Sequence, residues 1–484
     1  MFSCIMNKGN VFKCLLNGKW IESNTGKRDK IFSPVDGTIV GEVQCISQQE
    51  AEEFIVTAKD AQKDWNNVAV NKRADVVHKA ADILDREKET IAEVMVKEIA
   101  KNRKSSLSEI ARTVDFMHFT AEEGKRVVGE SLSSDSFPGF GKGKVSIVHR
   151  VPLGVILSIA PFNYPINLAA SKVAPALMAG NSVVLKPPTQ GAISSLYLGR
   201  VFCEAGVPPG VLNVITGQGR EIGDYLVSHP HINMIAFTGS SKVGRHIAQI
   251  AGMKPMLLEL GGKDAAIVLA DADLDITASN IVSGAFSYSG QRCTAVKRVL
   301  VIESVADELI KRIIKLVNSL TVGNPQDDAD ITPLISDSAA EFVKELIDDA
   351  AEKGARLLAG NKIEGNLIYP TVFDNVTKDM RLAWEEPFGP VLPIMRVKNS
   401  EEAIEIANRS EYGLQSSVFT SDIDNAFKIA SKLEVGTVQV NGKTERGPDH
   451  FPFIGVKSSG MGTQGIRYSI EAMSRSKAIV LNLK

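Results

Sequence analysis

The chain lacks the features that mark secreted, membrane and nucleic-acid-binding proteins. Its five cysteines are odd in number and scattered, with no C-x-x-C pair, which argues against a disulfide framework or a structural zinc site. A net charge of -2 gives no basic footprint for nucleic acid or an acidic membrane. No apolar run reaches the roughly 18 residues of a membrane helix, and residues 1–8 lack the apolar core of a signal peptide. We therefore expect a cytoplasmic protein in a reducing compartment.

Length and alternation of elements predict the fold class. At 484 residues the chain is too long for a single core and suggests roughly three domains. Apolar strand-like runs alternate with helical runs over residues 151–260 and again over 265–441. This alternation predicts two doubly wound α/β domains that bind ligands beyond the carboxyl ends of their strands.

The domain assignment follows from these patterns. We assign residues 1–124 and 150–260 to a dinucleotide-binding domain and 261–445 to a catalytic domain. Residues 14–21 predict a hairpin with an Asn-Gly turn, and residues 47–65, 72–88 and 90–124 predict three helices.

The remaining segments suggest a small β arm. Residues 125–149 are rich in serine and glycine and end in strand-like alternation, and residues 477–483 form a strand-like run with no hairpin partner nearby. An unpaired strand edge is an aggregation hazard. We therefore expect 125–149 and 446–484 to be oligomerisation segments, with the last strand paired to another subunit.

Cys293 is the candidate nucleophile. It follows Gly290, which permits close backbone approach, and has Arg292 beside it and Lys297 and Arg298 just downstream. Nearby cations lower the pKa of a thiol and favour the reactive thiolate. Free cysteines are often only buried core residues, but a flanking Gly-Gln-Arg sequence is not typical of a core.

Two further polar residues lie next to apolar strands. Glu259 ends the strand-like run 256–259; carboxylates are seldom fully buried without a partner, and a desolvated Glu suits general-base work near neutrality. Asn163, in the segment Pro161–Pro165 after the strand 155–160, is either part of a rigid turn or an amide donor.

Two glycine-containing segments are candidates for phosphate binding. The segment 217–223 has the spacing G-x-G-x-x-x-G, one residue too long for the dinucleotide fingerprint, and we reject it. In the segment 237–244, a strand end runs into a helix whose N-terminal amides and Ser240 hydroxyl suit a phosphate. The same serine would also serve as an ordinary helix cap.

Together these segments resemble the aldehyde dehydrogenase family. Six motifs match in order along essentially the whole chain: P-F-N-Y-P (161–165), K-P-P-T (186–189), F-T-G-S-x-x-x-G (237–244), E-L-G-G-K (259–263), G-Q-R-C (290–293) and E-E-P-F-G-P (385–390). The resemblance implies that Cys293 is the nucleophile and that Glu259 activates the deacylating water. It also implies that Asn163 and the Cys293 backbone N–H form an oxyanion hole.

The resemblance also implies a cofactor site and no metal. In the family, the positions of Gly239, Ser240 and Gly244 hold the pyrophosphate, those of Lys186 and Thr189 the adenosine ribose, and those of Glu386 and Phe388 the nicotinamide ribose and ring. Members with Glu in place of Thr189 favour NAD. Without that carboxylate a 2′-phosphate meets no like charge and can bond Lys186 and Thr189, so we expect NADP.

Less general residues indicate the substrate. Arg112, Tyr164, Arg292 and Arg446 fall on segments that border the substrate tunnel in the family, and arginine matches phosphate oxygens bidentately. These positions are similar to those of family members that oxidise D-glyceraldehyde 3-phosphate to 3-phosphoglycerate without making an acyl phosphate. We expect this reaction, through a thiohemiacetal and a thioester on Cys293, in a homotetramer.

Other functions stay open on the same residues. A lactaldehyde or semialdehyde dehydrogenase would use the arginines for a carboxylate or hydroxyl, a CoA-acylating enzyme would replace water with CoA, and a non-enzymatic protein would keep only the fold. Many members also carry Glu where this chain has Thr463-Gln464 after the S-G-M-G segment. We therefore assign no proton relay to the C-terminal segment.

Overall fold

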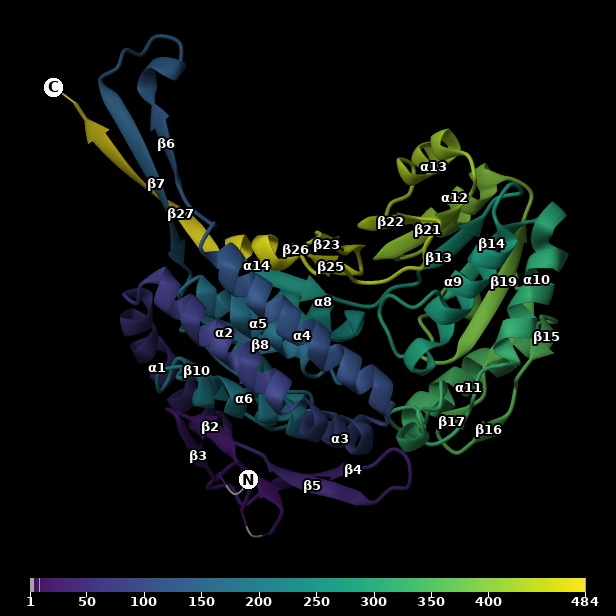
Figure 1. The fold of residues 1–484 in the computed structure, drawn as a ribbon, viewed down its shortest axis with the longest axis horizontal. Helices are drawn as coiled ribbons and strands as arrows, with labels where there is room; N and C mark the ends of the chain where they lie inside the picture. The colour runs from purple at the N-terminus through teal and green to yellow at the C-terminus, as the bar shows by residue number, and fades with distance from the viewer. Residues whose placement is uncertain (1–3, 8, 484) are drawn as a thin grey trace.

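The computed structural model describes residues 4–7 and 9–483, which form two helix-covered sheets and a long projecting arm (Figure 1). The first sheet has eight strands in the order β25-β12-β11-β8-β9-β10-β2-β3. Their bounds are β2 Cys14–Leu16, β3 Lys19–Ile21, β8 Val155–Ile159, β9 Ser182–Lys186, β10 Leu212–Val214, β11 Met234–Thr238, β12 Met256–Glu259 and β25 Gly460–Met461.

The centre of this sheet confirms the doubly wound prediction. Strands β8 to β12 are mutually parallel and are joined by α5 (Asn167–Met178), α6 (Ala192–Ala205), α7 (Gly219–Ser228) and α8 (Ser241–Ile250). The strand order reverses between β8 and β11, so their carboxyl ends open a crevice for ligands. The predicted Asn-Gly hairpin is also present, with Leu15 opposite Trp20.

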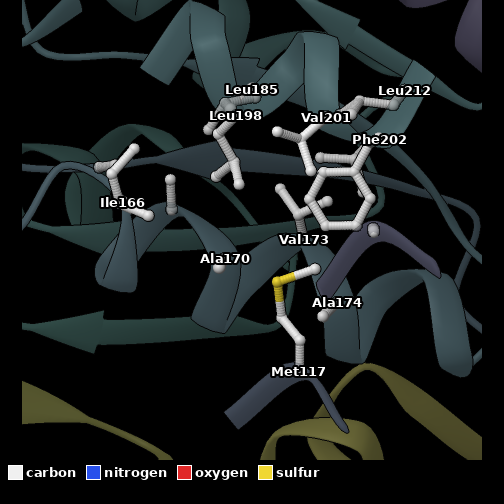
Figure 2. Close-up of a cluster of buried hydrophobic side chains, with 14 of the residues drawn as sticks. Met117, Ile166, Ala170, Val173, Ala174, Leu185, Leu198, Val201, Phe202 and Leu212 are labelled. Carbon is white, nitrogen blue, oxygen red and sulfur yellow. The ribbon is translucent and has the colours of Figure 1, made fainter. Parts of the chain in front are cut away.

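Helix α5 is buried along its whole length because it packs between the sheet and other helices. Figure 2 shows Val173 and Ala174 of α5 beside Phe202 of α6, with Met117 of the neighbouring helix α4 (Arg103–Gly124) on the other side. Full burial of a valine, phenylalanine or methionine side chain contributes roughly 1.5–3 kcal/mol to the free energy of unfolding. This packing fixes α5, whose first turn adjoins the site described below.

The helical run predicted over 90–124 is two helices rather than one. α3 (Lys88–Ile99) ends at Ala100, which has a left-handed φ of 50°, and α4 (Arg103–Gly124) begins at Asn102, whose side chain accepts a hydrogen bond from Ser105 N. Apolar residues continue on both sides of the break, so periodicity alone did not reveal it. The break turns the Lys101 side chain into the interior, where it is 1% exposed.

The second sheet has seven strands in the order β15-β18-β19-β14-β13-β21-β22. All its neighbouring pairs are parallel except β15 with β18. The strands are β13 Ala265–Val268, β14 Arg298–Ile302, β15 Arg356–Ala359, β18 Thr371–Asp374, β19 Val391–Val397, β21 Gln415–Phe419 and β22 Thr437–Val440. The covering helices are α9 Leu274–Phe286, α10 Glu303–Val317, α11 Asp337–Glu352, α12 Ser400–Asn408 and α13 Ile423–Ala430.

The arm consists of β6 (Glu130–Ser133), β7 (Lys144–Pro152) and β27 (Ser474–Asn482), and it projects from the body (Figure 1). The last strand, for which the sequence showed no hairpin partner nearby, has a distant partner in its own chain. Its expected pairing with another subunit stays a prediction, since β27 is an edge strand of this sheet. β27 pairs antiparallel with β7 from Ser474 opposite Pro152 to Asn482 opposite Lys144. The pairing joins segments more than three hundred residues apart, which no local pattern in the sequence could indicate.

The segment between β22 and β27 packs on the body. Strand β25 pairs with β12, and β24 (Val456–Lys457) pairs with β20 (Tyr412–Gly413). β23 (Phe453–Ile454) pairs with β26 (Thr463–Gln464), and α14 (Ile466–Ala472) packs on α4 and α5. The structure thus places only the end of the segment 446–484 in the arm.

The remaining elements lie towards the N-terminus and at the edge of the second sheet. β1 (Val11–Phe12), β4 (Arg28–Phe32) and β5 (Ile39–Gln44) form a small sheet, followed by α1 (Gln48–Asn66) and α2 (Val70–Arg86), and β16 (Ile363–Glu364) pairs with β17 (Leu367–Ile368). Among the described residues, no helix has the length and apolar character needed to span a membrane.

Candidate active site

The predicted catalytic and substrate residues meet where the two sheets face each other. Asn163 follows β8 and Glu259 ends β12, both at the carboxyl edge of the first sheet, whereas the Cys293 loop precedes β14 of the second sheet. One pocket is lined by Arg112, Tyr164, Asn167, Leu168, Thr238, Glu259, Arg292, Cys293, Thr294, Glu445, Arg446 and Phe453. The structure therefore brings the predicted nucleophile, the predicted base and all four predicted substrate residues together, and Asn163 is buried against the nucleophile loop.

A tight turn presents Cys293. Tyr288, Ser289 and Gly290 all have left-handed backbone conformations, with φ of 51°, 52° and 73°. A Cβ on Gly290 would lie 2.3 Å from the Gly389 carbonyl oxygen, so only glycine fits there. The Ser289 hydroxyl donates to the carbonyl oxygen of Thr332 at 2.8 Å, which helps to hold this strained turn in the interior.

The expected lowering of the Cys293 pKa is wrong. Burial raises the pKa of the thiol to about 11, with only Lys297 acting in the opposite direction. The Arg298 guanidinium points elsewhere and donates to four backbone carbonyls, and Arg292 Nη2 donates to Gly284 O at 2.6 Å. Sequence proximity placed these cations near the sulfur, but their side chains turn away from it. Cys293 therefore rests as a thiol and needs a base.

Glu259 has the properties of that base. Its side chain is buried, and desolvation raises its pKa to about 7 while Arg446 and Lys172 pull it down. Its Oε1 atom has no hydrogen-bond partner within the described chain. The Glu259 charge also raises the pKa of Cys293, which places the carboxyl close enough to the sulfur to interact electrostatically.

Lys172 belongs to the same charge cluster and was missed in the sequence. Its Nζ donates to Thr238 Oγ1 at 2.7 Å and to Leu168 O at 3.2 Å. Burial, with a contribution from the neighbouring Arg446, lowers its pKa to about 7. The sequence did contain a signal for Lys172, because it is the single charged residue in the fully buried helix α5.

Asn163 is anchored on the nucleophile loop. Its Nδ2 donates to the Gln291 carbonyl oxygen at 2.9 Å, which uses one of the two amide hydrogens. The Asn163 Oδ1 atom is buried without a hydrogen-bond partner among the described residues. The second hydrogen is therefore the one left to serve a substrate oxygen.

The predicted arginines meet at a carboxylate that sequence reasoning did not single out. Arg112 donates to Asp449 through Nε at 2.7 Å and Nη2 at 2.8 Å. Arg446 Nε lies 3.4 Å from the same carboxylate. Two of the three arginines thus already converge on one anionic group, whereas Arg292 is turned towards Gly284 O. No local pattern links Asp449 to Arg112, because the two are 337 positions apart.

The adenosine end of the predicted cofactor site offers a cation. Lys186 ends β9 and is buried, which lowers its pKa to about 8. Its Nζ donates to Pro187 O at 3.2 Å, and this is its one hydrogen bond within the described residues. Thr189 is exposed on the loop that follows. Spare donors on Lys186 beside an exposed hydroxyl suit a ribose with a 2′-phosphate.

The phosphate segment is shaped by glycines. Ser240 caps α8 by accepting from Val243 N at 3.3 Å. A Cβ on Gly239 would lie 2.5 Å from the Phe237 ring, and one on Gly244 would lie 2.3 Å from Leu260. The N-terminus of this ten-residue helix therefore lies close to the strand ends, as an anion-binding helix terminus requires.

The nicotinamide end adjoins the nucleophile loop. Glu386 accepts from Gly262 N at 3.1 Å and from Lys297 Nζ at 2.8 Å. Phe388 has a φ of 48°, and its ring packs edge-on against Phe162 with the centroids 5.9 Å apart. Taken together, the residues present fit a dinucleotide that runs from Lys186 to Glu386. Across the described ranges, no three His, Cys, Asp or Glu side chains gather as a metal site.

Comparisons with known proteins agree with this geometry. The model of the Aldehyde dehydrogenase family matches residues 20–479. The NADP-dependent glyceraldehyde-3-phosphate dehydrogenases of Streptococcus equinus and Pisum sativum are 57% and 52% identical over 98% of this chain, and over 99% and 96% of their own lengths. The crystal structure of the NADP-dependent glyceraldehyde-3-phosphate dehydrogenase from Bacillus halodurans C-125, complexed with NADP, superposes with a TM-score of 0.97 at 55% identity, covering 98% of this chain and 99% of that one.

Proposed function

This chain belongs to the aldehyde dehydrogenase family, and from that premise we propose that it oxidises D-glyceraldehyde 3-phosphate to 3-phosphoglycerate with NADP and water. The observation that carries the substrate is the pocket that Arg112, Arg292, Arg446 and Tyr164 line together with Cys293. Arginines in such a pocket suit a phosphate dianion. Relatives more than half identical to the chain are named NADP-dependent glyceraldehyde-3-phosphate dehydrogenase.

The first half of the reaction is acylation of Cys293. The sulfur attacks the aldehyde carbon as Glu259 takes up the thiol proton, and the carbonyl oxygen becomes the oxyanion of a thiohemiacetal. The free amide hydrogen of Asn163 and the Cys293 backbone N–H stabilise that charge, an effect worth roughly 3–4 kcal/mol per donor in other enzymes. Loss of hydride from the former aldehyde carbon then leaves a thioester on Cys293.

Bound NADP supplies the hydride acceptor. For its binding, the chain offers the N-terminus of α8 with Ser240 to the pyrophosphate and Lys186 with Thr189 to the adenosine ribose and its 2′-phosphate. Glu386 is placed for the nicotinamide ribose, and Phe388 for the ring. Thr189 carries no negative charge that would repel the 2′-phosphate, which supports NADP over NAD.

The second half is hydrolysis of the thioester. Glu259, with its pKa raised to about 7, first releases the thiol proton to solvent. The regenerated carboxylate then removes a proton from water, and the hydroxide adds to the thioester carbon. The tetrahedral adduct expels the Cys293 sulfur and yields a carboxylate. The overall balance is one aldehyde, one NADP and one water converted to one carboxylate, one NADPH and protons, with no acyl phosphate formed.

The assembly and compartment remain proposals as well. We expect a homotetramer in the cytoplasm. The arm exposes Leu132, Phe137 and Phe140, and β27 exposes Ile479 and Val480. Apolar side chains gathered on a projecting element support association between subunits. Light scattering of the purified protein measures the subunit number directly.

The deciding experiment mixes enzyme, D-glyceraldehyde 3-phosphate and NADP in buffer free of phosphate and CoA, and follows the absorbance of reduced nicotinamide. Reduction that depends on Cys293 supports hydrolytic, non-phosphorylating oxidation. Activity on lactaldehyde or a semialdehyde alone would keep the family and reject the substrate. If no aldehyde is oxidised and Cys293 is not labelled by iodoacetamide, the protein is not an enzyme of this kind.

A further inference from the structure

A buried ion pair lies directly beneath the Asn163 loop. Lys101 and Glu109 are 1% and 3% exposed, and Lys101 Nζ donates to Glu109 Oε2 at 2.5 Å. Two such charges in the interior carry a desolvation penalty, so a well-packed apolar pair of similar volume is often no less stable. The contacts of the pair with the active site give a more specific reason for its presence than stability alone.

Lys101 holds the backbone of the oxyanion residue. Besides Glu109, its Nζ donates to the Asn163 carbonyl oxygen at 3.0 Å. The same ammonium lies 3.4 Å from the centroid of the Tyr164 ring and 4.8 Å from that of Tyr288. It thereby contacts the oxyanion loop, one predicted substrate residue and the nucleophile turn at once. A desolvated cation over an aromatic face is attracted electrostatically by the ring.

Glu109 holds the residues that follow. Its Oε1 accepts from Ile166 N and from Asn167 N, both at 3.0 Å. Ile166 at the start of α5 has no side-chain cap, so the Glu109 carboxylate, coming from α4, satisfies these orphan N–H groups in its place. The helix that carries Asn167, Leu168 and Lys172 into the site is therefore fixed by the partner of Lys101.

The opposite side of the loop is tied to the nucleophile. Asn163 Nδ2 donates to Gln291 O at 2.9 Å, two residues before Cys293. The Tyr288 hydroxyl donates to Ile99 O at 3.0 Å, at the end of α3 and two residues before Lys101. The Tyr164 and Tyr288 rings meet edge-on with their centroids 6.3 Å apart. The break between α3 and α4 thus contacts both loops that must align for attack on the carbonyl.

From these contacts we propose that Lys101 and Glu109 are positioning residues, which set the Asn163 amide against the Cys293 loop for stabilisation of the oxyanion. Neither side chain lines the pocket, so both act through Asn163 and Tyr164. The inference rests on the oxyanion role given to Asn163 in the proposed function. It does not depend on which aldehyde is the substrate.

The test uses Lys101→Met/Glu109→Gln in the full-length enzyme. Methionine keeps the length of the stem, and glutamine keeps an acceptor for the α5 N–H groups, so no unpaired charge is left in the interior. Loss of the donor to Asn163 O lets the loop move, and a misplacement of about 1 Å costs roughly 10²-fold in rate. We expect kcat/KM to fall about that much, with the KM for NADP within twofold of wild type.

Alkylation of Cys293 by iodoacetamide separates positioning from general disruption, because this reaction develops no oxyanion. Its rate should stay within twofold of wild type in the double variant. A folded variant whose kcat/KM is within threefold of wild type overturns the proposal. A parallel fall in alkylation and turnover overturns it too, because it shows that the whole site has collapsed.

Two further variants complete the design. Should the double variant fail to fold, Lys101→Arg keeps the ion pair but is too large to remain over the Tyr164 ring and still reach Asn163 O, so the same loss is expected. The matched control is Asp374→Asn, which weakens the ion pair between the buried Asp374 of β18 and the partly buried Arg396 of β19. It should lower the thermal midpoint and leave kcat/KM within twofold.

The substrate panel keeps the two hypotheses apart. Wild-type enzyme is assayed first on D-glyceraldehyde 3-phosphate, lactaldehyde and a semialdehyde. If only one of the last two is oxidised, the proposed substrate fails, and the positioning test is run on the aldehyde that works. A loss of roughly 10²-fold there still supports Lys101 and Glu109, and an unchanged rate still overturns their role.

Discussion

Replacing Glu259 by glutamine tests the base through both stability and activity. Burial raises its pKa from the ordinary 4.5 to about 7, and one pKa unit corresponds to about 1.4 kcal/mol. The folded state therefore favours the protonated carboxyl, and ionised Glu259 reduces stability by about 3 kcal/mol. Because the folded pKa is raised, this penalty is absent below about pH 4, grows between the two pKa values and is complete above pH 7.

The substitution Glu259→Gln is expected to stabilise the folded protein. Glutamine carries no charge at any pH, so Glu259→Gln should be more stable than wild type by about 3 kcal/mol at pH 8 and by less than about 1 kcal/mol at pH 5. Arg446 and Lys172 both face the carboxyl and favour its ionised form, and Cys293 faces it as a neutral thiol. The Lys172 pKa is itself lowered to about 7, so this attraction weakens as the pH rises.

The activity prediction uses the same pKa. Wild-type steady-state turnover should fall as the pH drops through about 7, because protonated Glu259 cannot deprotonate water. Glu259→Gln should slow the burst of about one NADPH per subunit, because no carboxylate takes up the Cys293 proton, and should slow the steady state by roughly 10²–10⁴-fold and lose this pH dependence. Stopped-flow absorbance measures the burst and the steady state, and thermal unfolding at pH 5 and pH 8 measures stability.

Two outcomes would refute this reasoning. An unchanged steady-state rate would remove Glu259 as the deacylation base. A variant no more stable than wild type at pH 8 would show that the carboxyl is not strained by burial. Glu98→Gln is a suitable control, since burial raises the Glu98 pKa to about 7 as well and Glu98 does not line the pocket. Its ratio of burst to steady state should match wild type.

Four other substitutions test the remaining roles. Cys293→Ser should abolish turnover and the burst, as measured by NADPH formation; robust residual activity would remove Cys293 as nucleophile. Arg446→Ala or Arg112→Ala should raise KM for D-glyceraldehyde 3-phosphate at least about tenfold more than for glyceraldehyde, because a charge-assisted contact contributes about 1.5–3 kcal/mol; equal effects on both would contradict the clamp. Thr189→Glu should shift kcat/KM from NADP towards NAD by about tenfold or more, since the new carboxylate repels a 2′-phosphate; an unchanged ratio would mean that Thr189 does not read the ribose.

The sequence was most informative where the signal is local. Apolar runs such as those at 155–160 and 265–269 correspond to buried parallel strands because both faces of each sheet are covered. The Asn-Gly turn predicted the first hairpin correctly because the turn depends only on the backbone conformation of its own two residues. Motif residues could be placed at strand ends because in a doubly wound sheet the loops at the carboxyl ends converge.

The sequence was uninformative where contacts are long-range. Asp449 meets Arg112 across 337 positions, and β27 meets β7 across a similar separation. The direction of a side chain was equally hidden. Arg298 is five residues from Cys293, yet its guanidinium points to carbonyl oxygens of other segments. Proximity along the chain therefore gave the wrong sign for the Cys293 pKa.

The raised pKa of Cys293 has a consequence for the mechanism. Burial holds the pKa of Cys293 well above that of Glu259, so moving the thiol proton to the carboxylate in the empty site is unfavourable. A free thiolate is therefore rare in the empty site, and proton removal must be coupled to formation of the bond to carbon. The geometry that matters is then the alignment of sulfur, aldehyde and oxyanion donor. A charged pair buried beneath Asn163, which fixes that alignment from outside the pocket, fits such a site better than one that relies on a permanent thiolate.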